Sequence, residues 1–407
     1  MPNWKPVTSN PSPSQEAATL LARLLAMPAR RGRVTHVEHV PARQAGQAHW
    51  PDWVPEPLID RLRNQGVAGL WAHQLAAAEH VRRGQNVIIS TGTASGKSLA
   101  YLVPAVTEIF GGGTVLYLTP TKALAADQLR TIAALRLTEV RAATYDGDTP
   151  ADERPWVRQH ANYVLTNPDM LHRSMLPLHA QWSGFWRRLR LVVVDECHGY
   201  RGVFGSHVAQ ILRRLRRVCG KYGSLPVFLL ASATASDPGT AATRLTGLET
   251  AEVTMDGSPR GATTFALWEP PLTDLRGEQG APLRRTATAE TADLLADLVI
   301  EGVRTLAFVR SRRAAETVAL TARRHLEEIS AELPDRVAAY RAGYLAEDRR
   351  TLEKALRAGE ITGLATTNAL ELGVDVSGLD AVLVAGWPGT RASLWQQAGR
   401  AGRDGQD

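Results

Sequence analysis

Thr91-Gly92-Thr93-Ala94-Ser95-Gly96-Lys97-Ser98 carry the strongest structural signal in this chain of 407 residues. The segment follows a short apolar run and precedes a helical pattern, which is the context of a phosphate-binding loop. Backbone N–H groups at the start of such a helix bind phosphates. We expect Lys97 to reach the β- and γ-phosphates of a nucleotide and the Ser98 hydroxyl to hold Mg²⁺. The strict pattern has Gly in place of Thr91, and a plain Gly/Ser connection between strand and helix is the alternative.

A pair of carboxylates, Asp195 and Glu196, ends a second apolar run farther along the chain. The carboxyl ends of parallel strands meet at one edge of a sheet, so these acids are expected beside the loop. We expect Asp195 to bind Mg²⁺ and Glu196 to orient and deprotonate the attacking water. Two surface carboxylates after a strand are the alternative. His198 is expected to couple this site to Ser232-Ala233-Thr234, which follow the next strand.

Two arginines near the end of the chain complete the pattern, within Gln396-Gln397-Ala398-Gly399-Arg400-Ala401-Gly402-Arg403. Arg400 and Arg403 are three residues apart and share a face if 395–403 is helical. Guanidinium groups suit the charge that grows on a transferring γ-phosphoryl group, whereas a solvated basic face is the alternative. Gln397 is expected to take part in coupling. The three segments in this order predict two lobes that close on ATP.

Composition restricts the class of protein. A hydrophobic content of 44% and a charged content of 22% are ordinary for a soluble protein. No apolar run approaches the ~20 residues that a membrane helix needs, and the N-terminus lacks a secretory pattern, so we expect a cytoplasmic protein without membrane partners. Two cysteines cannot build a four-cysteine zinc site, so no zinc is expected. A net charge of +6 favours a polyanionic partner.

Strands and helices alternate in two stretches, which predicts two α/β lobes, each a RecA-like, doubly wound parallel sheet. We expect an N-terminal extension at 1–65, a first lobe at 66–250, a connection at 251–290 and a second, incomplete lobe at 291–407. The predicted strands are 86–90, 114–119, 163–166, 191–195, 227–231, 263–268, 305–309, 337–340, 363–366 and 381–385. The predicted helices include 98–110, 122–135, 314–325 and 348–358.

Two further features allow more than one interpretation. Arg213, Arg214, Arg216 and Arg217 form a basic helical run that would either meet DNA or, as we favour, present a solvated helix face. The tryptophans of Trp50-Pro51-Asp52-Trp53 are expected to pack on a lobe rather than to stack on bases.

Taken together, these segments resemble the superfamily 2 helicases over nearly the whole chain. Trp71-Ala72-His73-Gln74 is similar to the motif in which a glutamine, here Gln74, reads adenine. Gly373 and Asp375, in the Ala365–Asp375 stretch, are expected at the nucleotide by the same resemblance. The resemblance also implies that hydroxyls, short polar side chains and amides grip one nucleic-acid strand by its phosphates. The residues that match these gripping motifs are Thr121, Lys122, Thr166, Asn167, Ser311, Arg312, Thr366 and Thr367.

A narrower resemblance is carried by Asp195-Glu196-Cys197-His198 with the residues that follow it, and by Tyr145–Pro150 and Tyr340–Tyr344. These segments are similar to the DECH-box, RecQ-like DNA-repair helicases of the MrfA/Hrq type. That family implies ATP-dependent, 3′-to-5′ translocation on single-stranded DNA and a cysteine-rich, zinc-binding C-terminal domain. We further expect single-stranded or tailed duplex DNA as the partner, a monomer and a nucleoid-associated location. The sequence stops four residues after Arg403, so we expect that domain to be missing here.

Two other functions remain open at this stage. An RNA helicase of the DEAD-box kind is disfavoured because Cys197-His198 replace Ala-Asp and Gln396-Gln397 replace His-Arg. A nucleic-acid-binding scaffold with a degenerate nucleotide site is disfavoured by the intact Lys97 and the two carboxylates. DNA and RNA of the same sequence, compared as activators of ATP hydrolysis, would separate the first alternative from a DNA motor.

Overall fold

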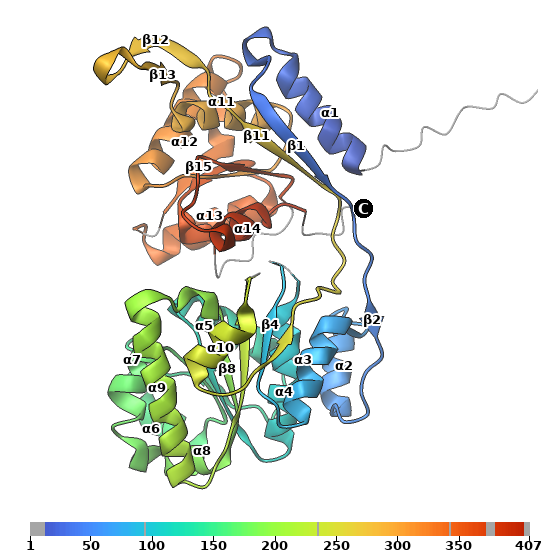
Figure 1. Ribbon diagram of the computed structural model, residues 1–407, viewed down its shortest axis with the longest axis vertical. Helices are drawn as coiled ribbons and strands as arrows, with labels where there is room; N and C mark the ends of the chain where they lie inside the picture. The colour runs from blue at the N-terminus through green and yellow to red at the C-terminus, as the bar shows by residue number, and fades with distance from the viewer. Residues whose placement is uncertain (1–12, 93–94, 234–235, 342, 372–378, 403–407) are drawn as a thin grey trace, which may run out of the picture. The chain divides into compact units, whose positions relative to one another are not determined.

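Two parallel sheets organise the chain, one in each of two compact units (Figure 1). The computed structural model describes residues 13–92, 95–233, 236–341, 343–371 and 379–402. The first-lobe unit contains residues 45–258. The second-lobe unit contains the described residues of 1–44, 259–371 and 375–407. In the described part of the chain, no helix is both long and apolar enough to cross a bilayer.

The first-lobe sheet has seven strands, all parallel, in the order β10-β4-β9-β8-β5-β7-β6. Its central strands are buried on both faces, because alternate residues enter two separate hydrophobic clusters. This confirms the doubly wound sheet expected from the apolar runs. The strands are β4 (Val87–Ser90), β5 (Thr114–Leu118), β6 (Ala142–Thr144), β7 (Tyr163–Thr166), β8 (Leu189–Val194), β9 (Val227–Ser232) and β10 (Ala251–Val253).

Helices cover both faces of this sheet. One cluster joins it to α2 (Glu56–Asn64), α3 (Ala72–Arg82), α4 (Lys97–Phe110) and α5 (Lys122–Ala134). The other joins it to α6 (Glu153–His160), α8 (Ser183–Arg188), α9 (Gly202–Lys221) and α10 (Pro238–Thr246). The short helix α7 (Pro168–Met170) and the two-stranded pair β2 (Gln47–Ala48) and β3 (Leu70–Trp71) complete the unit.

The second-lobe sheet has four parallel strands in the order β15-β16-β14-β17. The strands are β14 (Thr305–Phe308), β15 (Val337–Tyr340), β16 (Gly363–Thr366) and β17 (Ala381–Val384). The helices are α11 (Ala287–Ile300), α12 (Arg312–Glu327), α13 (Ala346–Ala358) and α14 (Arg391–Ala398). A third hydrophobic cluster joins α11 and α12 to this sheet.

The start of the chain belongs to the second-lobe unit. Strand β1 (Val34–Val40), which follows α1 (Pro13–Ala26), pairs antiparallel with β11 (Thr263–Trp268), and a hairpin of β12 (Leu272–Arg276) and β13 (Pro282–Arg284) comes next. Arg33 and Trp268 both donate to the buried carboxylate of Glu290 on α11. The N-terminal segment is therefore joined to β11 by strand pairing and to α11 by an ionic network.

The two N-terminal tryptophans pack on the first-lobe unit, as expected. Trp50 Nε1 donates to the Ala68 carbonyl at 2.9 Å, and Trp53 Nε1 donates to Glu79 at 2.8 Å. Both rings lie against the cluster that covers one face of the sheet. Their polar and apolar parts are thus used within the fold.

Candidate nucleotide site

The phosphate-binding loop connects the end of β4 to α4. The hydroxyls of Thr91 and Ser95 lie 2.6 Å apart and both residues are buried, so Thr91 braces the loop where the strict pattern has Gly. Gly96 has φ of +68°, and a Cβ there would come within 2.6 Å of the Trp71 ring and 2.8 Å of the Gln74 amide. Only glycine suits that position. Thr93 and Ala94 lie outside the described residues.

Lys97 and Ser98 start α4 and face the loop. Lys97 Nζ donates to the carbonyl oxygens of Thr91 at 3.2 Å and Gly92 at 2.8 Å, so the ammonium group is held where the loop backbone converges. Ser98 Oγ lies 3.3 Å from Tyr101 Oη and 3.4 Å from Gln128 Nε2. Both side chains are therefore placed beside the phosphate-binding backbone.

Asp195 follows β8, and its carboxylate is almost completely buried. Its Oδ2 accepts hydrogen bonds from Tyr101, at 3.2 Å, and from Tyr117. Its Oδ1 accepts the N–H of Glu196 at 2.9 Å. Burial raises the pKa of Asp195, whereas the Tyr117 hydroxyl and the charge of Lys97 oppose that rise. The carboxylate is thus buried but well supplied with donors.

The oxygens of Ser98 and Asp195 fit a magnesium site. Both lie within hydrogen-bond distance of the same Tyr101 hydroxyl, so the two side chains converge on one place. Hydroxyl and carboxylate oxygens are the hard ligands that Mg²⁺ prefers. The donor set therefore agrees with the metal expected from the sequence.

The backbone of Glu196 is strained, because its φ of +49° is a value that residues other than glycine rarely adopt. Its Oε2 lies 3.2 Å from His198 Nδ1, and the same nitrogen lies 3.3 Å from the backbone nitrogen of Ala233. A protonated Nδ1 donates to Glu196, whereas an unprotonated Nδ1 accepts the Ala233 N–H. His198 therefore joins the acidic motif to the end of β9, where Ser232 donates to the Ala233 carbonyl. Thr234 lies outside the described residues.

Gln74 and His73 support the loop from α3. Gln74 Oε1 accepts the Trp71 N–H at 2.9 Å and Nε2 donates to the Gly96 carbonyl at 2.8 Å. His73 Nδ1 accepts the Gly257 N–H at 3.0 Å, which leaves Nε2 to donate to the Ser95 carbonyl at 2.8 Å. The sequence predicted no role for His73, because a buried histidine in a helix gives no local signal.

We expect four first-lobe residues to contact a nucleic acid. They lie at or shortly after the ends of β5 and β7, at the same sheet edge as the loop. Thr121 Oγ accepts the Leu124 N–H and Asn167 Oδ1 accepts the Met170 N–H, so both cap helices. Thr166 is buried and donates to the Tyr145 carbonyl. Lys122 is exposed and forms an ion pair with Asp148 at 2.6 Å.

The second-lobe residues that we expect to contact a nucleic acid lie at or shortly after the ends of β14 and β16. Ser311 caps α12 through the Ala314 N–H, and Arg312 beside it is exposed. Thr366 is buried and donates to the Thr367 carbonyl. Thr367 Oγ accepts the Ala369 N–H at 3.4 Å. Both sets of residues therefore also cap turns, which is an ordinary use of Ser, Thr and Asn.

The condition that 395–403 is helical is not met. Helix α14 stops at Ala398, and Gly399 caps it. Arg400 follows in a turn, is buried, and donates through Nη2 to the Glu371 carbonyl at 2.6 Å. Gln397 donates to the Glu371 carboxylate at 3.1 Å. Arg403, like Gly373 and Asp375, lies outside the described residues.

The arginine run on α9 has a different use from either expected one. Arg213 donates to the carbonyls of Arg244 and Leu245, and Arg216 donates to those of Thr246 and Gly247, at the C-terminal end of α10. Cations at a helix C-terminus satisfy its unpaired carbonyls. The favoured prediction of a solvated face is therefore wrong for these two residues.

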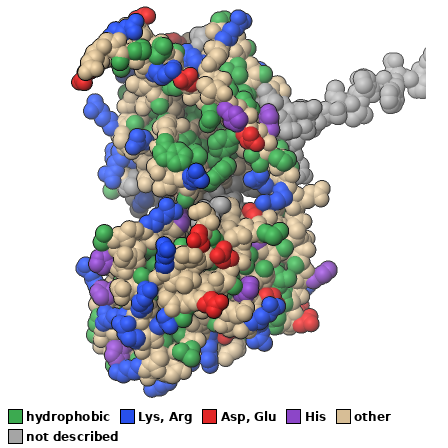
Figure 2. All heavy atoms as spheres, in the orientation of Figure 1, with side chains coloured by type: hydrophobic (Ala, Val, Ile, Leu, Met, Phe, Trp, Pro, Cys, Tyr) green, Lys and Arg blue, Asp and Glu red, His purple; other side chains and the backbone are tan. Residues whose placement is uncertain are grey.

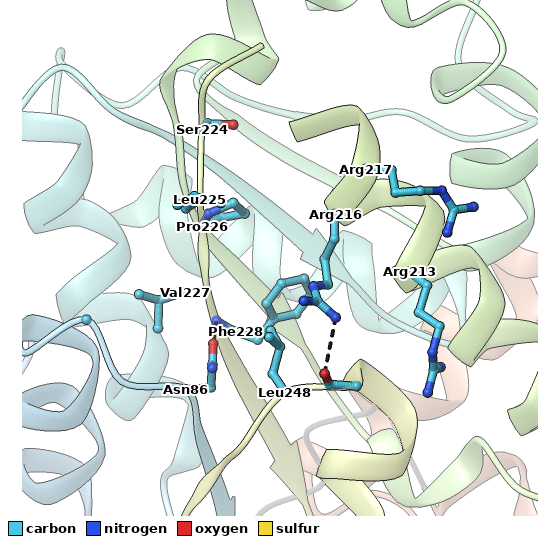
Figure 3. A pocket seen from close by; sticks show the side chains of 12 residues that line it. Asn86, Arg213, Arg216, Arg217, Ser224, Leu225, Pro226, Val227, Phe228 and Leu248 are labelled. Carbon is cyan, nitrogen blue, oxygen red and sulfur yellow. Dashed lines mark hydrogen bonds between the residues drawn. The ribbon is translucent and has the colours of Figure 1, made fainter. Parts of the chain in front are cut away.

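These arginines also border a pocket of about 590 Å³ (Figure 3). Asn86 and Val227 lie beside it, at the beginning of β4 and β9. It is therefore at the sheet edge opposite the phosphate-binding loop and is not the nucleotide site. In Figure 2, Lys and Arg side chains are spread over this part of the first-lobe unit.

Comparison with known proteins agrees with this geometry. The chain matches the DEAD/DEAH box helicase family over residues 71–241 and the helicase conserved C-terminal domain over residues 290–405. The ATP-dependent helicase YprA of Bacillus subtilis (strain 168) is 40% identical over 377 residues, which are 91% of this chain and 49% of that protein. The ATP-dependent helicase HRQ1 of Saccharomyces cerevisiae is 42% identical over 350 residues, which are 83% of this chain and 32% of that protein.

Solved structures show the same relationship. The DUF1998 helicase MrfA bound to DNA has a TM-score of 0.86 and 38% identity, covering 94% of this chain and 51% of that one. The chain thus spans about half or less of the length of these relatives. The term RecQ-like fits this chain only loosely, because the relatives that it matches are of the Hrq1 and MrfA type. One family match falls on each unit, and the phosphate-binding loop and the acidic motif share one sheet edge. The chain belongs to the superfamily 2 helicases of the DEAD/DEAH-box class, in the group of Hrq1 and MrfA.

Proposed function

We propose that this chain is the ATP-hydrolysing motor of a DNA helicase. The observation that carries the proposal is the convergence of Lys97, Ser98, Asp195 and Glu196 at one edge of the first-lobe sheet. The similarity to MrfA, whose structure was solved bound to DNA, supports DNA as the nucleic acid.

Each side chain has a distinct task in this proposal. Lys97 binds the β- and γ-phosphates with the loop backbone, and Glu196 orients the attacking water and accepts its proton. Ser98 and Asp195 would hold Mg²⁺, which when bound would supply positive charge to offset the charge on the phosphates. His198 contacts both the Glu196 carboxylate and the backbone at the end of β9, so it couples these two parts of the site.

The second-lobe arginines are assigned to the transferring phosphoryl group. We retain Arg400 and Arg403 as the groups that stabilise the transferring phosphoryl. Arg400 Nη2 already donates to the Glu371 carbonyl, so this role requires that bond to break or another N–H of the guanidinium to act. Gln74, the proposed adenine reader, also has bonds within the fold. Its amide keeps one N–H and one lone pair beyond these two bonds, and these groups would have to contact the adenine.

The finer properties follow from resemblance to the Hrq1 and MrfA group. We infer 3′-to-5′ translocation on single-stranded DNA, a role in DNA repair, a monomeric state and a nucleoid-associated location. The motor domains at 66–250 and 291–407, and a zinc-binding domain in the whole protein, belong to the same inference. Backbone contacts to DNA would make binding sequence-tolerant and salt-sensitive.

Two variants test the nucleotide site. Lys97→Ala is expected to lose binding of a fluorescent ATP analogue. Glu196→Gln is expected to bind it as the unchanged protein does and to hydrolyse ATP at least ~100-fold more slowly, within the usual range for loss of a general base. Normal hydrolysis by Glu196→Gln would refute the assigned base. Polarity is tested separately, with duplexes that carry a single-stranded tail at the 3′ or the 5′ end.

A further inference from the structure

Two buried tyrosines contact the same oxygen of the acidic motif. Tyr117, on β5, and Tyr101, on α4, both hydrogen-bond to Oδ2 of Asp195. The two side chains are at most 1% exposed, and their ring centroids are 5.7 Å apart. Strand β5 is the direct neighbour of β8, which delivers Asp195. The pair is therefore held rigidly by the centre of the sheet and by the helix that follows the phosphate-binding loop.

Tyr101 also links the two oxygens that we assign to magnesium. Its hydroxyl lies 3.2 Å from Asp195 Oδ2 and 3.3 Å from Ser98 Oγ. A tyrosine hydroxyl has a single proton. The hydroxyl can donate that proton to Asp195 Oδ2 or to Ser98 Oγ, and it lies within hydrogen-bond distance of both oxygens in either case. Gln128 Nε2 also donates to Ser98 Oγ, at 3.4 Å, so two neighbours hold this oxygen in place.

We propose that Tyr101 and Tyr117 are positioning residues that fix the magnesium-binding oxygens of Ser98 and Asp195. The proposal rests on the function proposed above, because it takes these two oxygens as ligands. Mg²⁺ demands near-ideal geometry, and residues behind the ligands commonly hold them in it. With two hydroxyls on Oδ2 and the Glu196 N–H on Oδ1, the carboxylate has one defined orientation.

The chain offers a matched control in Tyr163. This tyrosine lies on β7, on the other side of β5, and is equally buried. Within the described residues its hydroxyl has no hydrogen-bond partner. Tyr163→Phe therefore removes a hydroxyl from the same hydrophobic cluster without removing a hydrogen bond to Asp195.

The experiment measures magnesium-dependent nucleotide binding rather than activity. The Kd of a fluorescent ADP is determined with Mg²⁺ and with EDTA, for the unchanged chain, Tyr101→Phe, Tyr117→Phe, Tyr163→Phe and Asp195→Asn. Loss of a hydrogen bond to a charged group is expected to reduce the Mg²⁺-induced tightening about tenfold in Tyr117→Phe. We expect Tyr101→Phe to act in the same direction, the Kd in EDTA to stay constant, and Tyr163→Phe to match the unchanged chain.

The outcomes separate the inference from the proposed site. If Asp195→Asn loses the tightening while Tyr117→Phe and Tyr163→Phe behave alike, the positioning role is wrong and the magnesium site stands. If Asp195→Asn keeps the full tightening, the assignment of Asp195 to magnesium is wrong and the inference fails with it. Circular dichroism melts of the three phenylalanine variants show that each is folded at the assay temperature.

Discussion

Glu290→Gln is expected to destabilise the second-lobe unit strongly, although Glu290 is remote in sequence from every motif. The carboxylate is 5% exposed and accepts three hydrogen bonds at 2.8 Å, from Arg33, Trp268 and Arg285. Two of these donors lie in the N-terminal segment and in β11, so Glu290 joins three parts of the chain. The substitution keeps the shape of the side chain and removes its charge.

The magnitude follows from the burial of the partners. The Arg33 side chain is 15% exposed, so its charge would lose the buried Glu290 carboxylate while staying poorly hydrated. Removing one member of a buried ion pair costs about 3–5 kcal/mol, and the more exposed Arg285 adds little. We therefore expect the free energy of unfolding of the second-lobe unit to fall by about 3 kcal/mol.

Native-state hydrogen exchange of the α11 and β14 amides measures this loss for the second-lobe unit by itself. Glu301→Gln is the control, since the Glu301–Arg23 pair is partly exposed and should cost less than ~1 kcal/mol. Equal effects of the two substitutions would contradict the reasoning.

The same network predicts a pH dependence. Burial acts to raise the pKa of Glu290, but the hydrogen bonds from Trp268, Arg285 and Arg33 outweigh it, so the pKa is lowered in the folded state. The ionised carboxylate therefore stabilises the folded state at pH values above the pKa of Glu in the unfolded chain, ~4.3. This stabilisation is lost as the pH falls through the lower pKa of Glu290 in the folded state. The unchanged chain and Glu290→Gln should therefore converge in stability below that range.

Three further substitutions test other parts of the structure. Gly205→Ala would bring a Cβ within 2.4 Å of the Tyr200 carbonyl oxygen near the start of α9, so the temperature of thermal unfolding should be clearly lower. Gly199→Ala is the control, because the added atom has open space around it and the unfolding temperature should not change. Arg216→Met keeps the apolar stem but loses two bonds to the end of α10, so urea denaturation should show a loss of about 1–2 kcal/mol, and the exposed Arg217→Met should show less than half of that. Gln74→Ala removes the amide that holds Gly96, and the Kd for ADP in EDTA is expected to rise about tenfold, with no rise contradicting that role.

Much of the fold was predictable because its strands are short apolar runs. The strands expected at 163–166, 263–268, 337–340 and 363–366 coincide with β7, β11, β15 and β16. The pairing of β1 with β11 was not predictable, since it joins residues more than two hundred positions apart. Local periodicity carries no information about such a partner.

The site was predictable where chemistry requires a fixed spacing, and not where it depends on packing. The loop and the acidic motif share a sheet edge because parallel strands present their carboxyl ends together. Tyr101 and Tyr117 lie in apolar runs, where a tyrosine that binds a carboxylate looks like any core residue. Whether the helix before Arg400 continues was left as a condition, and Gly399 in fact ends it.

We expect this chain to hydrolyse ATP in a DNA-stimulated manner. Its rate of ATP hydrolysis is measured without nucleic acid, with single-stranded DNA and with single-stranded RNA of the same sequence, using Glu196→Gln as the inactive control. We expect strong stimulation by DNA, little by RNA, and none in Glu196→Gln. Stimulation by RNA instead of DNA, or ATP that is bound but not hydrolysed under any condition, would show that the chain is not a DNA-stimulated ATP hydrolase.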